Sequence, residues 1–198
     1  MTKKSGRPAR SQVDIQAMRT KIANVARDLF REEGFDAVSI RRLAKEVGCA
    51  PMTIYAHFDN KTAILRHLWG DVLNALFTEI QIKLVRVKTA GERLEIAAQT
   101  FVSYWVQNPE HFRLIFMSND VMRSDVDTFI QDGQTLEYFN SFNNLVQDVL
   151  PANTNPKSKT DVLISGLIGI ALCHNTIRDY PWSAPEIMTS RLVTGTYS

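Results

Sequence analysis

Residues 39–61 bring together side chains suited to binding a polyanion. Ser39 precedes a short helical pattern, so its hydroxyl and the free N–H groups of the first turn can bind a phosphate. Arg41 and Arg42 follow at once, and either guanidinium can reach a nucleic acid backbone. This combination predicts contacts with phosphate groups.

Pro51, Met52 and Thr53 begin a second helical pattern in the same stretch. Proline suits a first helical position, because its missing N–H is not needed there and its φ angle is already set. Apolar groups at this end of a helix can meet thymine methyl groups, and the Thr53 hydroxyl can hydrogen-bond to a base edge. The three residues are therefore candidates for reading a DNA sequence.

The two helical patterns are joined by a tight turn. In the first, residues 39–47, the apolar side chains recur at steps of three and four residues, which predicts one buried helix face. Gly48 ends it, since glycine adopts the left-handed conformation without steric cost. Ala44 allows close approach, Gly48 turns the chain and Ile54 fills the corner, so this stretch predicts a helix-turn-helix whose second helix enters the major groove of DNA.

The run VGCAPMTIYAHFDNK, from Val47 to Lys61, resembles the DNA-binding domain of the TetR family of bacterial repressors. It is preceded by a long helical pattern that ends near Gly34 and Phe35, and by Val38, Ser39 and Ile40. The resemblance covers roughly the first third of the chain. It implies an all-α protein, with an N-terminal three-helix helix-turn-helix domain and a helical C-terminal domain for ligand binding and dimerisation.

The resemblance also assigns roles to single residues. Tyr55, His57 and Lys61 match positions that typically hold phosphates in the family. Ala50 stands where a serine is frequent and Met52 where a small residue is frequent, so the cap and the outer face of the second helix differ from the common pattern. A surface histidine and core aromatics are the alternative interpretation, and Phe58 is predicted to be core.

Charge is distributed unevenly along the 198 residues, although the net charge is only +2. Residues 1–66 hold 13 Lys and Arg against 7 Asp and Glu, whereas residues 67–198 hold 10 against 14. A basic first third suits a DNA-binding module.

We expect a flexible basic arm at 1–12, a DNA-binding domain at 13–60 and a ligand-binding and dimerisation domain at 61–198. The arm, with Lys3, Lys4, Arg7 and Arg10, either orders on DNA or is a solvated tail.

Helical periodicity continues to the C-terminus, without a run of strand-like alternation. It predicts a first helix over 14–33 and a long helix over 61–88 that could link the two domains. Further helices are expected near 92–107, 109–118, 125–149, 157–179 and 184–195, with breaks at proline-containing segments. The chain is therefore predicted to be all-α.

Bulky apolar side chains are concentrated in the second domain and could line a cavity for an apolar ligand, although an ordinary aromatic core is the alternative. The candidates are Phe101, Tyr104, Trp105, Phe112, Phe116, Met117, Met122 and Phe139. Polar groups that could orient such a ligand are His111, Cys173, His174, Asn175 and Arg178.

Small residues interrupt the most apolar helical pattern, at Ser165, Gly166, Gly169 and Ala171. A helix this apolar must be buried nearly all round in water. We expect it to pack against a second copy, in a four-helix homodimer interface completed by Ile187, Leu192 and Val193. A central helix of a monomer is the alternative.

Several protein classes lack support in the sequence. No GxSxG, P-loop, GxGxxG or HExxH motif points to an enzyme or a cofactor, and the histidines lack metal-ligand spacing. The sequence predicts a soluble cytoplasmic protein, because its two cysteines are isolated, its N-terminus does not resemble a signal peptide and no apolar run is long enough to span a membrane.

We expect a repressor that is released from a palindromic operator by a small apolar molecule. The alternative is a DNA-binding protein without an inducer, or an activator.

Overall fold

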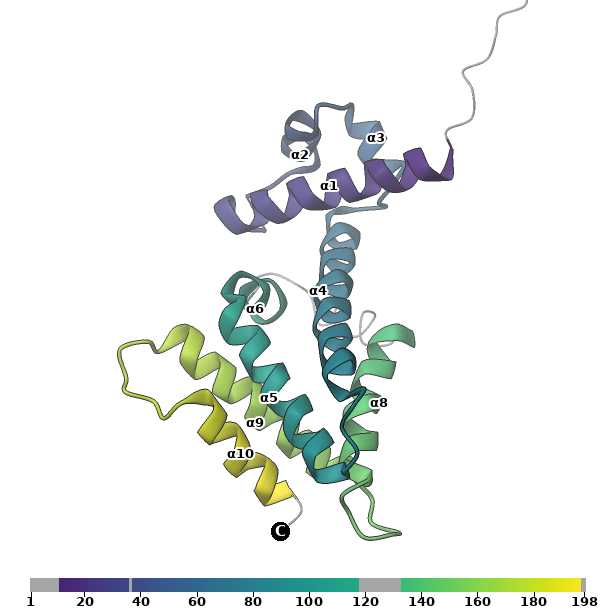
Figure 1. The fold of residues 1–198 in the computed structure, drawn as a ribbon. Helices are drawn as coiled ribbons and strands as arrows, with labels where there is room; N and C mark the ends of the chain where they lie inside the picture. Colours follow the sequence, from purple (N-terminus) through teal and green to yellow (C-terminus); the bar gives the residue numbers. More distant parts are fainter. Residues whose placement is uncertain (1–10, 36, 118–132, 197–198) are drawn as a thin grey trace, which may run out of the picture. The chain divides into compact units, whose positions relative to one another are not determined.

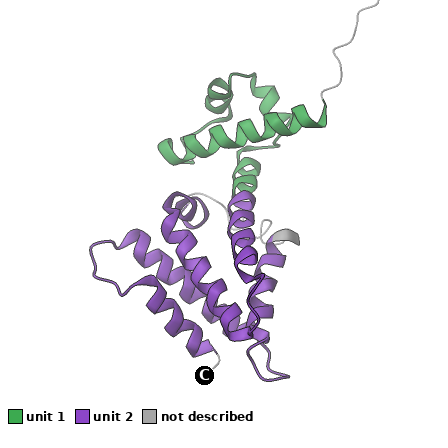
Figure 2. Ribbon diagram, in the orientation of Figure 1, with its two compact units in different colours: residues 1–68 green, residues 69–198 purple. Residues whose placement is uncertain are grey.

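The computed structural model describes residues 11–35, 37–117 and 133–196. Every regular element among these residues is a helix, as the sequence predicts. The chain divides into two compact units, residues 1–68 and 69–198 (Figure 2). The division falls inside a helix, Lys61–Leu84, whereas the predicted boundary lies just before this helix. The predicted basic arm lies mostly outside the described residues.

The first unit consists of three helices and the start of a fourth (Figure 1). They are α1 (Gln12–Glu33), α2 (Ile40–Val47), α3 (Pro51–Tyr55) and α4 (Lys61–Leu84). α1 begins two residues earlier than predicted, because Ser11 and Asp14 form a reciprocal capping box. The Ser11 Oγ accepts a hydrogen bond from the Asp14 N–H at 3.1 Å.

The ends of α2 and α3 follow the chemistry of the residues there. Ser39 caps α2, with its Oγ accepting a hydrogen bond from the Arg42 N–H at 3.1 Å. Gly48 ends α2 with a φ angle of +78°, which glycine adopts without strain. Ala50 offers α3 no side-chain cap, and Pro51 occupies its first turn. The predicted start, stop and missing cap are confirmed.

The second unit contains the remainder of α4 and five further described helices (Figure 1). These are α5 (Ala90–Gln107), α6 (Pro109–Phe116), α8 (Gly133–Gln147), α9 (Lys157–Thr176) and α10 (Pro185–Thr196). Their ends lie within a few residues of the predicted ones where both can be compared. Met122 and the first part of the helix predicted over 125–149 lie outside the described residues.

α5 is the central helix of the second unit and packs against α6, α8, α9 and α10. Its apolar residues form one core with side chains from α4, α6, α8, α9 and α10. Trp105 of α5, Phe112 of α6 and Phe142 of α8 are the bulkiest fully buried side chains. Phe101 packs edge-to-face against Phe142, and Trp105 packs edge-to-face against Phe112. These contacts between helices stabilise the unit.

Tyr104 carries its hydroxyl into this core, where it lies 3.3 Å from the Val72 carbonyl oxygen and 3.0 Å from the His111 Nδ1. Burial, and then the negative charge of Glu79, raise the pKa of Tyr104 from 10.0 to about 12. The folded chain therefore keeps the phenol proton at a pH where the unfolded chain has released it.

We expect this shift to make stability fall as the pH rises. The contribution of Tyr104 is fully present below pH 10 and is lost between pH 10 and about 12. Urea unfolding should show that Tyr104→Phe, although about 1 kcal/mol less stable at pH 7, loses less stability than the parent above pH 10. Equal losses in the two proteins would contradict the burial argument.

None of the described helices combines the length and apolar character that a membrane crossing requires. Within the same residues, no three or more His, Cys, Asp or Glu side chains gather where a metal ion could be held.

Candidate nucleic-acid interface and ligand cavity

α2, the turn and α3 form the helix-turn-helix that the sequence predicts. Ala44 and Ile54 are almost completely buried between the helices. The N–H groups of Gly48 and Cys49 both donate to the Ala44 carbonyl oxygen, at 3.0 and 2.9 Å, and so close the turn. Phe58 is also buried, which confirms its prediction as a core residue.

The outer face of α3 is open to solvent. Met52 is 74% exposed and Tyr55 is 48% exposed, which is unusual for side chains of this size. Pro51 is exposed beside them, and Thr53 is half-buried. The residues predicted to face DNA are therefore accessible, and their contacts with DNA stay a prediction.

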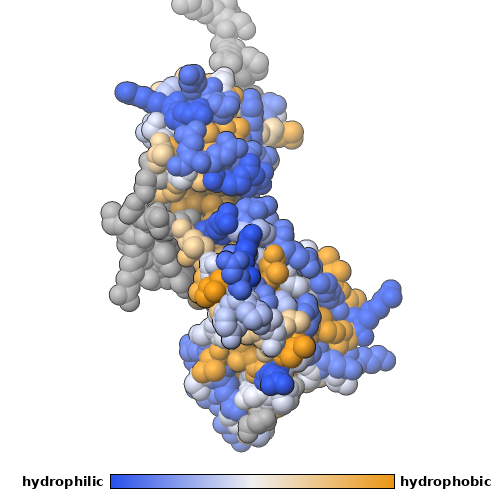
Figure 3. Space-filling view, turned by 90° about the vertical axis from the view of Figure 1, so that its left-hand side faces the viewer, coloured by the Kyte–Doolittle hydropathy of each residue, from blue (hydrophilic) through white to orange (hydrophobic). Residues whose placement is uncertain are grey.

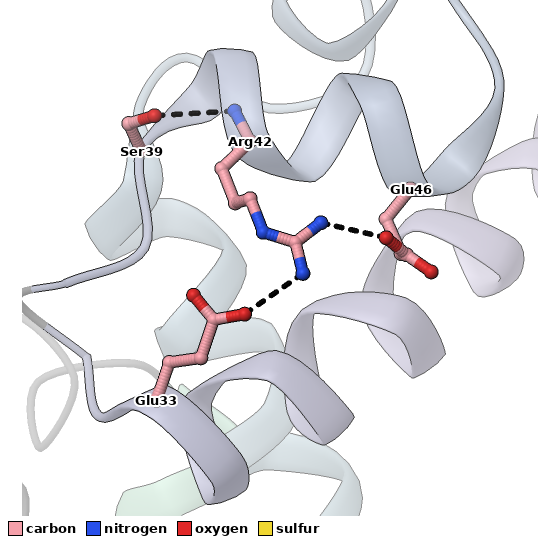
Figure 4. A network of polar contacts seen from close by, with 4 residues as sticks. All are labelled: Glu33, Ser39, Arg42 and Glu46. Atoms are coloured by element: carbon pink, nitrogen blue, oxygen red, sulfur yellow. Dashed lines mark hydrogen bonds and ion pairs between the residues drawn. The ribbon is translucent and has the colours of Figure 1, made fainter.

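Arg42 is engaged within the protein itself (Figure 4). Its Nη1 donates to Glu46 Oε2 at 2.6 Å, and its Nη2 donates to Glu33 Oε1 at 2.8 Å. The hydrogen bonds to Glu46, and then to Glu33, raise the pKa of the Arg42 guanidinium above its ordinary value. Arg42 thus links α1 to α2, and the neighbouring Arg41, which is exposed, is the better candidate for a phosphate contact.

Two substitutions separate the roles of these arginines. We expect Arg41→Ala to weaken binding to all duplexes and to lower the slope of log affinity against log salt by about 1. Arg42→Ala should lower thermal stability and leave that slope nearly unchanged, because it removes the link to Glu33. Fluorescence anisotropy over a range of salt concentrations measures the slope, and equal slopes for the two variants would exclude the division of roles.

Lys61 also has partners inside the first unit. Its Nζ donates to the Phe35 carbonyl oxygen at 2.7 Å and lies 4.1 Å from the centre of the Phe35 ring. A phosphate contact by Lys61 would have to share or replace these interactions. No local pattern indicates this second role of Lys61, since Phe35 and Lys61 are far apart along the chain.

Two basic residues of α1 were missed as supports of the helix-turn-helix. Arg19 donates to the His57 carbonyl oxygen, after α3, and its guanidinium lies over the Phe58 ring at 4.2 Å. Lys21 donates to the Val47 carbonyl oxygen at 2.9 Å, at the end of α2. His57 itself is half-buried. Helical periodicity places these lysine and arginine side chains on α1, but it does not reveal which carbonyl group they reach.

A cavity of about 200 Å³ lies within the second unit. Four of the predicted ligand-binding residues line it: Phe101, Trp105, Phe116 and Phe139. Further lining residues, which the sequence analysis did not single out, include Trp69 and Phe77 of α4, Ile115 of α6, Thr135 and Phe142 of α8, and Ile168 of α9. Of the described lining residues, seven are aromatic and none is charged.

The other predicted ligand-binding residues that the structure describes are not among those that line this cavity. Phe112 is fully buried in the core beside Trp105, and the Tyr104 hydroxyl binds inside the unit. Met117 is 46% exposed, at the end of α6. His174 has its Nε2 buried without a hydrogen-bond partner among the described residues, but its side chain is not part of the lining.

The small residues of α9 lie on different faces of the helix. A Cβ atom at Gly166 would lie only 2.5 Å from Leu192 Cδ2, so Gly166 serves packing of α9 on α10 within the chain. Ala171 and Val193 are fully buried as well. Their assignment to contacts with a second copy is wrong, because packing inside the unit already buries one face of α9.

The opposite face of α9 is exposed and largely apolar. Ser165 is exposed, Val162 is 67% exposed and Leu172 is 41% exposed, and they recur at helical spacing around Gly169. Ile187 of α10 is also exposed. The connection between α9 and α10 lies on the left of the second unit in Figure 1. Figure 3 views the molecule from this side and shows hydrophobic residues at the surface of the second unit.

The arrangement of α1, α2 and α3 defines a helix-turn-helix transcriptional regulator that binds DNA. Residues 22–68 match the family model described as "Bacterial regulatory proteins, tetR family". Residues 22–68 therefore form a DNA-binding domain of the TetR family type, as the sequence resemblance predicted.

Known relatives agree with this assignment. An HTH-type transcriptional regulator of Staphylococcus aureus strain USA300 is 25% identical over 154 residues, which cover 78% of this chain and 80% of the relative. The fatty acid degradation regulator FadR of Bacillus halodurans shares the fold, with a TM-score of 0.71, 14% identity and coverage of 90% and 94% of the two chains. FadR of Bacillus subtilis, solved in complex with stearoyl-CoA, has a TM-score of 0.68, 14% identity and coverage of 90% and 97%.

Proposed function

We propose that this regulator is a ligand-responsive repressor, which binds a palindromic operator as a homodimer and is released by a small apolar molecule. The observation that supports it best is that one chain holds both a helix-turn-helix with an open outer face and an uncharged cavity in a separate unit. The first suits DNA and the second suits a ligand.

On DNA, residues of α3 contact base edges, and residues close to α3 contact phosphates. Met52 offers an apolar group to thymine methyls and Thr53 a hydroxyl to a base edge. Ser39 and Arg41 contact the backbone from the start of α2. Tyr55, His57 and Lys61 add phosphate contacts, and the basic residues of 1–12 add charge that is independent of sequence.

A second copy of the chain is needed because one helix-turn-helix reads only one half-site. The exposed stripe on α9, made by Val162, Ser165, Gly169 and Leu172, is the surface that supports self-association. Small residues at its centre allow two helices to approach closely, and burial of the exposed apolar groups favours the dimer. Twofold symmetry of such a dimer matches a palindromic operator.

The ligand acts by differential binding. Two conformations of the dimer differ in the spacing of their α3 helices, and only one of them fits successive major grooves. A molecule that binds the cavity better in the other conformation lowers DNA affinity by the ratio of its two affinities. A ligand-bound structure of similar fold, the FadR of Bacillus subtilis, supports a ligand response, although acyl-CoA is not carried over to the cavity described here.

The experiment measures binding of the full-length protein to DNA from its own promoter region by fluorescence anisotropy. We expect tight binding to one palindromic duplex of this region, and a screen of small apolar compounds should yield some that release the protein from it. A reporter gene behind this promoter should be expressed more strongly when the regulator is deleted. Binding without preference for any duplex from the native genome would refute the proposal, and lower reporter expression on deletion would instead identify an activator.

A further inference from the structure

One residue that lines the cavity in the second unit carries a buried polar group without a partner among the described residues. Trp105 is fully buried and lines the cavity, and its Nε1–H has no acceptor among the described residues. A buried donor without a partner is costly, so native proteins rarely leave one. An acceptor supplied from outside the chain would remove this cost.

The other two tryptophans show that this donor differs from its counterparts. Trp69 lines the same cavity, but its Nε1–H donates to the Leu114 carbonyl oxygen at 2.8 Å. Trp182 donates its Nε1–H to the Ile177 carbonyl oxygen at 2.9 Å. These are all the tryptophans of the chain. Trp105 is therefore the tryptophan whose N–H has no acceptor in the described part of the chain.

The remaining lining limits the charge and the size of a ligand. No described lining residue carries a charge, and transfer of an ion from water into such surroundings is strongly unfavourable. The volume of about 200 Å³ is below the roughly 300 to 1,000 Å³ of common ligand pockets, and modestly above the roughly 150 Å³ cavity that accepts benzene. A compact neutral molecule fits these limits.

Two other occupants fit less well. A water molecule needs two to four polar partners, and the Trp105 N–H and the Thr135 hydroxyl are the only side-chain groups among the described lining residues that could supply them. A cation would be attracted by the aromatic faces, but no carboxylate lies in the lining to compensate its lost hydration, and the Trp105 N–H presents a positive end.

We propose that the cavity selects a small neutral aromatic molecule carrying one hydrogen-bond acceptor, such as a ketone oxygen, which accepts from the Trp105 N–H. The inference rests on the proposed function in taking this cavity as the ligand site, and it adds the chemical class of the ligand. The aromatic walls bind the ring of the ligand, and the single N–H fixes its orientation.

Four matched probes test the proposal with the full-length protein, in the absence of DNA. They are acetophenone, α-methylstyrene, in which a CH₂ group replaces the ketone oxygen, benzoate and phenyltrimethylammonium. Isothermal titration calorimetry should show acetophenone binding roughly tenfold more tightly than α-methylstyrene. Both charged probes should bind more weakly than acetophenone. Equal affinity for acetophenone and α-methylstyrene, tighter binding of a charged probe, or no binding of any probe would overturn the proposal.

Substitutions locate the effect. Trp105→Phe keeps an aromatic wall but removes the N–H, so the preference for acetophenone over α-methylstyrene should fall to about one. Trp69→Phe is the matched control, because its N–H is already used by Leu114, and the preference should persist. A preference that survives Trp105→Phe would overturn the assignment of the donor.

A measurement on the unsubstituted protein avoids any loss of folding in the variants. Acetophenone should move the Trp105 indole ¹H–¹⁵N signal downfield and shift the signals of Trp69 and Trp182 less. The absence of a downfield shift would overturn the proposal.

The outcome for this inference can be distinguished from the outcome for the proposed function. Selective binding of acetophenone without release of DNA would refute ligand control and leave this inference intact. Release of DNA by apolar compounds, with equal affinity for acetophenone and α-methylstyrene, would do the reverse.

Discussion

Replacing Gly169 by arginine is expected to give a folded monomer that binds operator DNA at least 100-fold more weakly. A Cβ atom at Gly169 would meet no other atom within 4 Å, so the chain itself has room for a side chain there. Arginine is also a better helix former than glycine. On the exposed face around Gly169, however, a long charged side chain would hold two copies apart.

The loss in affinity follows from divalency. Two linked helix-turn-helix units bind two half-sites with an avidity of about 10² to 10⁴ over one unit, and this gain disappears in a monomer. Sedimentation velocity measures the oligomeric state and fluorescence anisotropy measures operator affinity. Asn140→Arg, at an exposed position of α8, adds the same charge elsewhere and should leave both unchanged. An intact Gly169→Arg dimer would place the interface on another surface.

Replacing Phe112 by alanine is expected to lower the free energy of unfolding by about 3–5 kcal/mol. Phe112 is fully buried and packs edge-on against Trp105 and at a tilt against Phe116. Its removal loses apolar burial and leaves a void that α5 and α6 cannot close. For a chain of this length, the melting temperature should fall by roughly 6–20 °C.

Met117→Ala is the matched control for this prediction. Both residues were candidates for the ligand cavity, but Met117 is substantially exposed and neither lines the cavity. We expect its effect on the free energy of unfolding to stay within about 0.5 kcal/mol. Thermal unfolding followed by circular dichroism compares the variants. A small effect of Phe112→Ala would mean that the α5–α6 contact contributes little to stability.

The elements of the fold were largely predictable because their ends depend on local chemistry. Ser39, Gly48 and Pro51 fix the boundaries of α2 and α3 through a cap, a left-handed turn and a preset φ angle. The capping box at Ser11 was overlooked, although Asp14 three residues later is its sequence signature. Local signals of this kind need no knowledge of the tertiary structure.

The candidate sites were less predictable because they depend on residues that are distant along the chain. Arg41 and Arg42 are adjacent, and only the position of Glu33 on another helix separates their roles. Phe112 and Phe116 are one helical turn apart, yet only Phe116 borders the cavity. Helical periodicity indicates that a side chain is apolar and inward, but not whether it meets a void or another side chain.

The anchoring of the helix-turn-helix by α1 limits how this protein can be engineered. Arg19 donates a hydrogen bond to a main-chain oxygen just beyond α3, and Lys21 donates one to a main-chain oxygen at the end of α2. Met52 lies at the surface and takes no part in these contacts. A chimera designed to recognise a new operator should therefore exchange the exposed positions of α3 one by one. Grafting α2 and α3 alone onto a foreign regulator would omit the hydrogen bonds from Arg19 and Lys21. We expect α3 then to be misaligned for contacts with base edges.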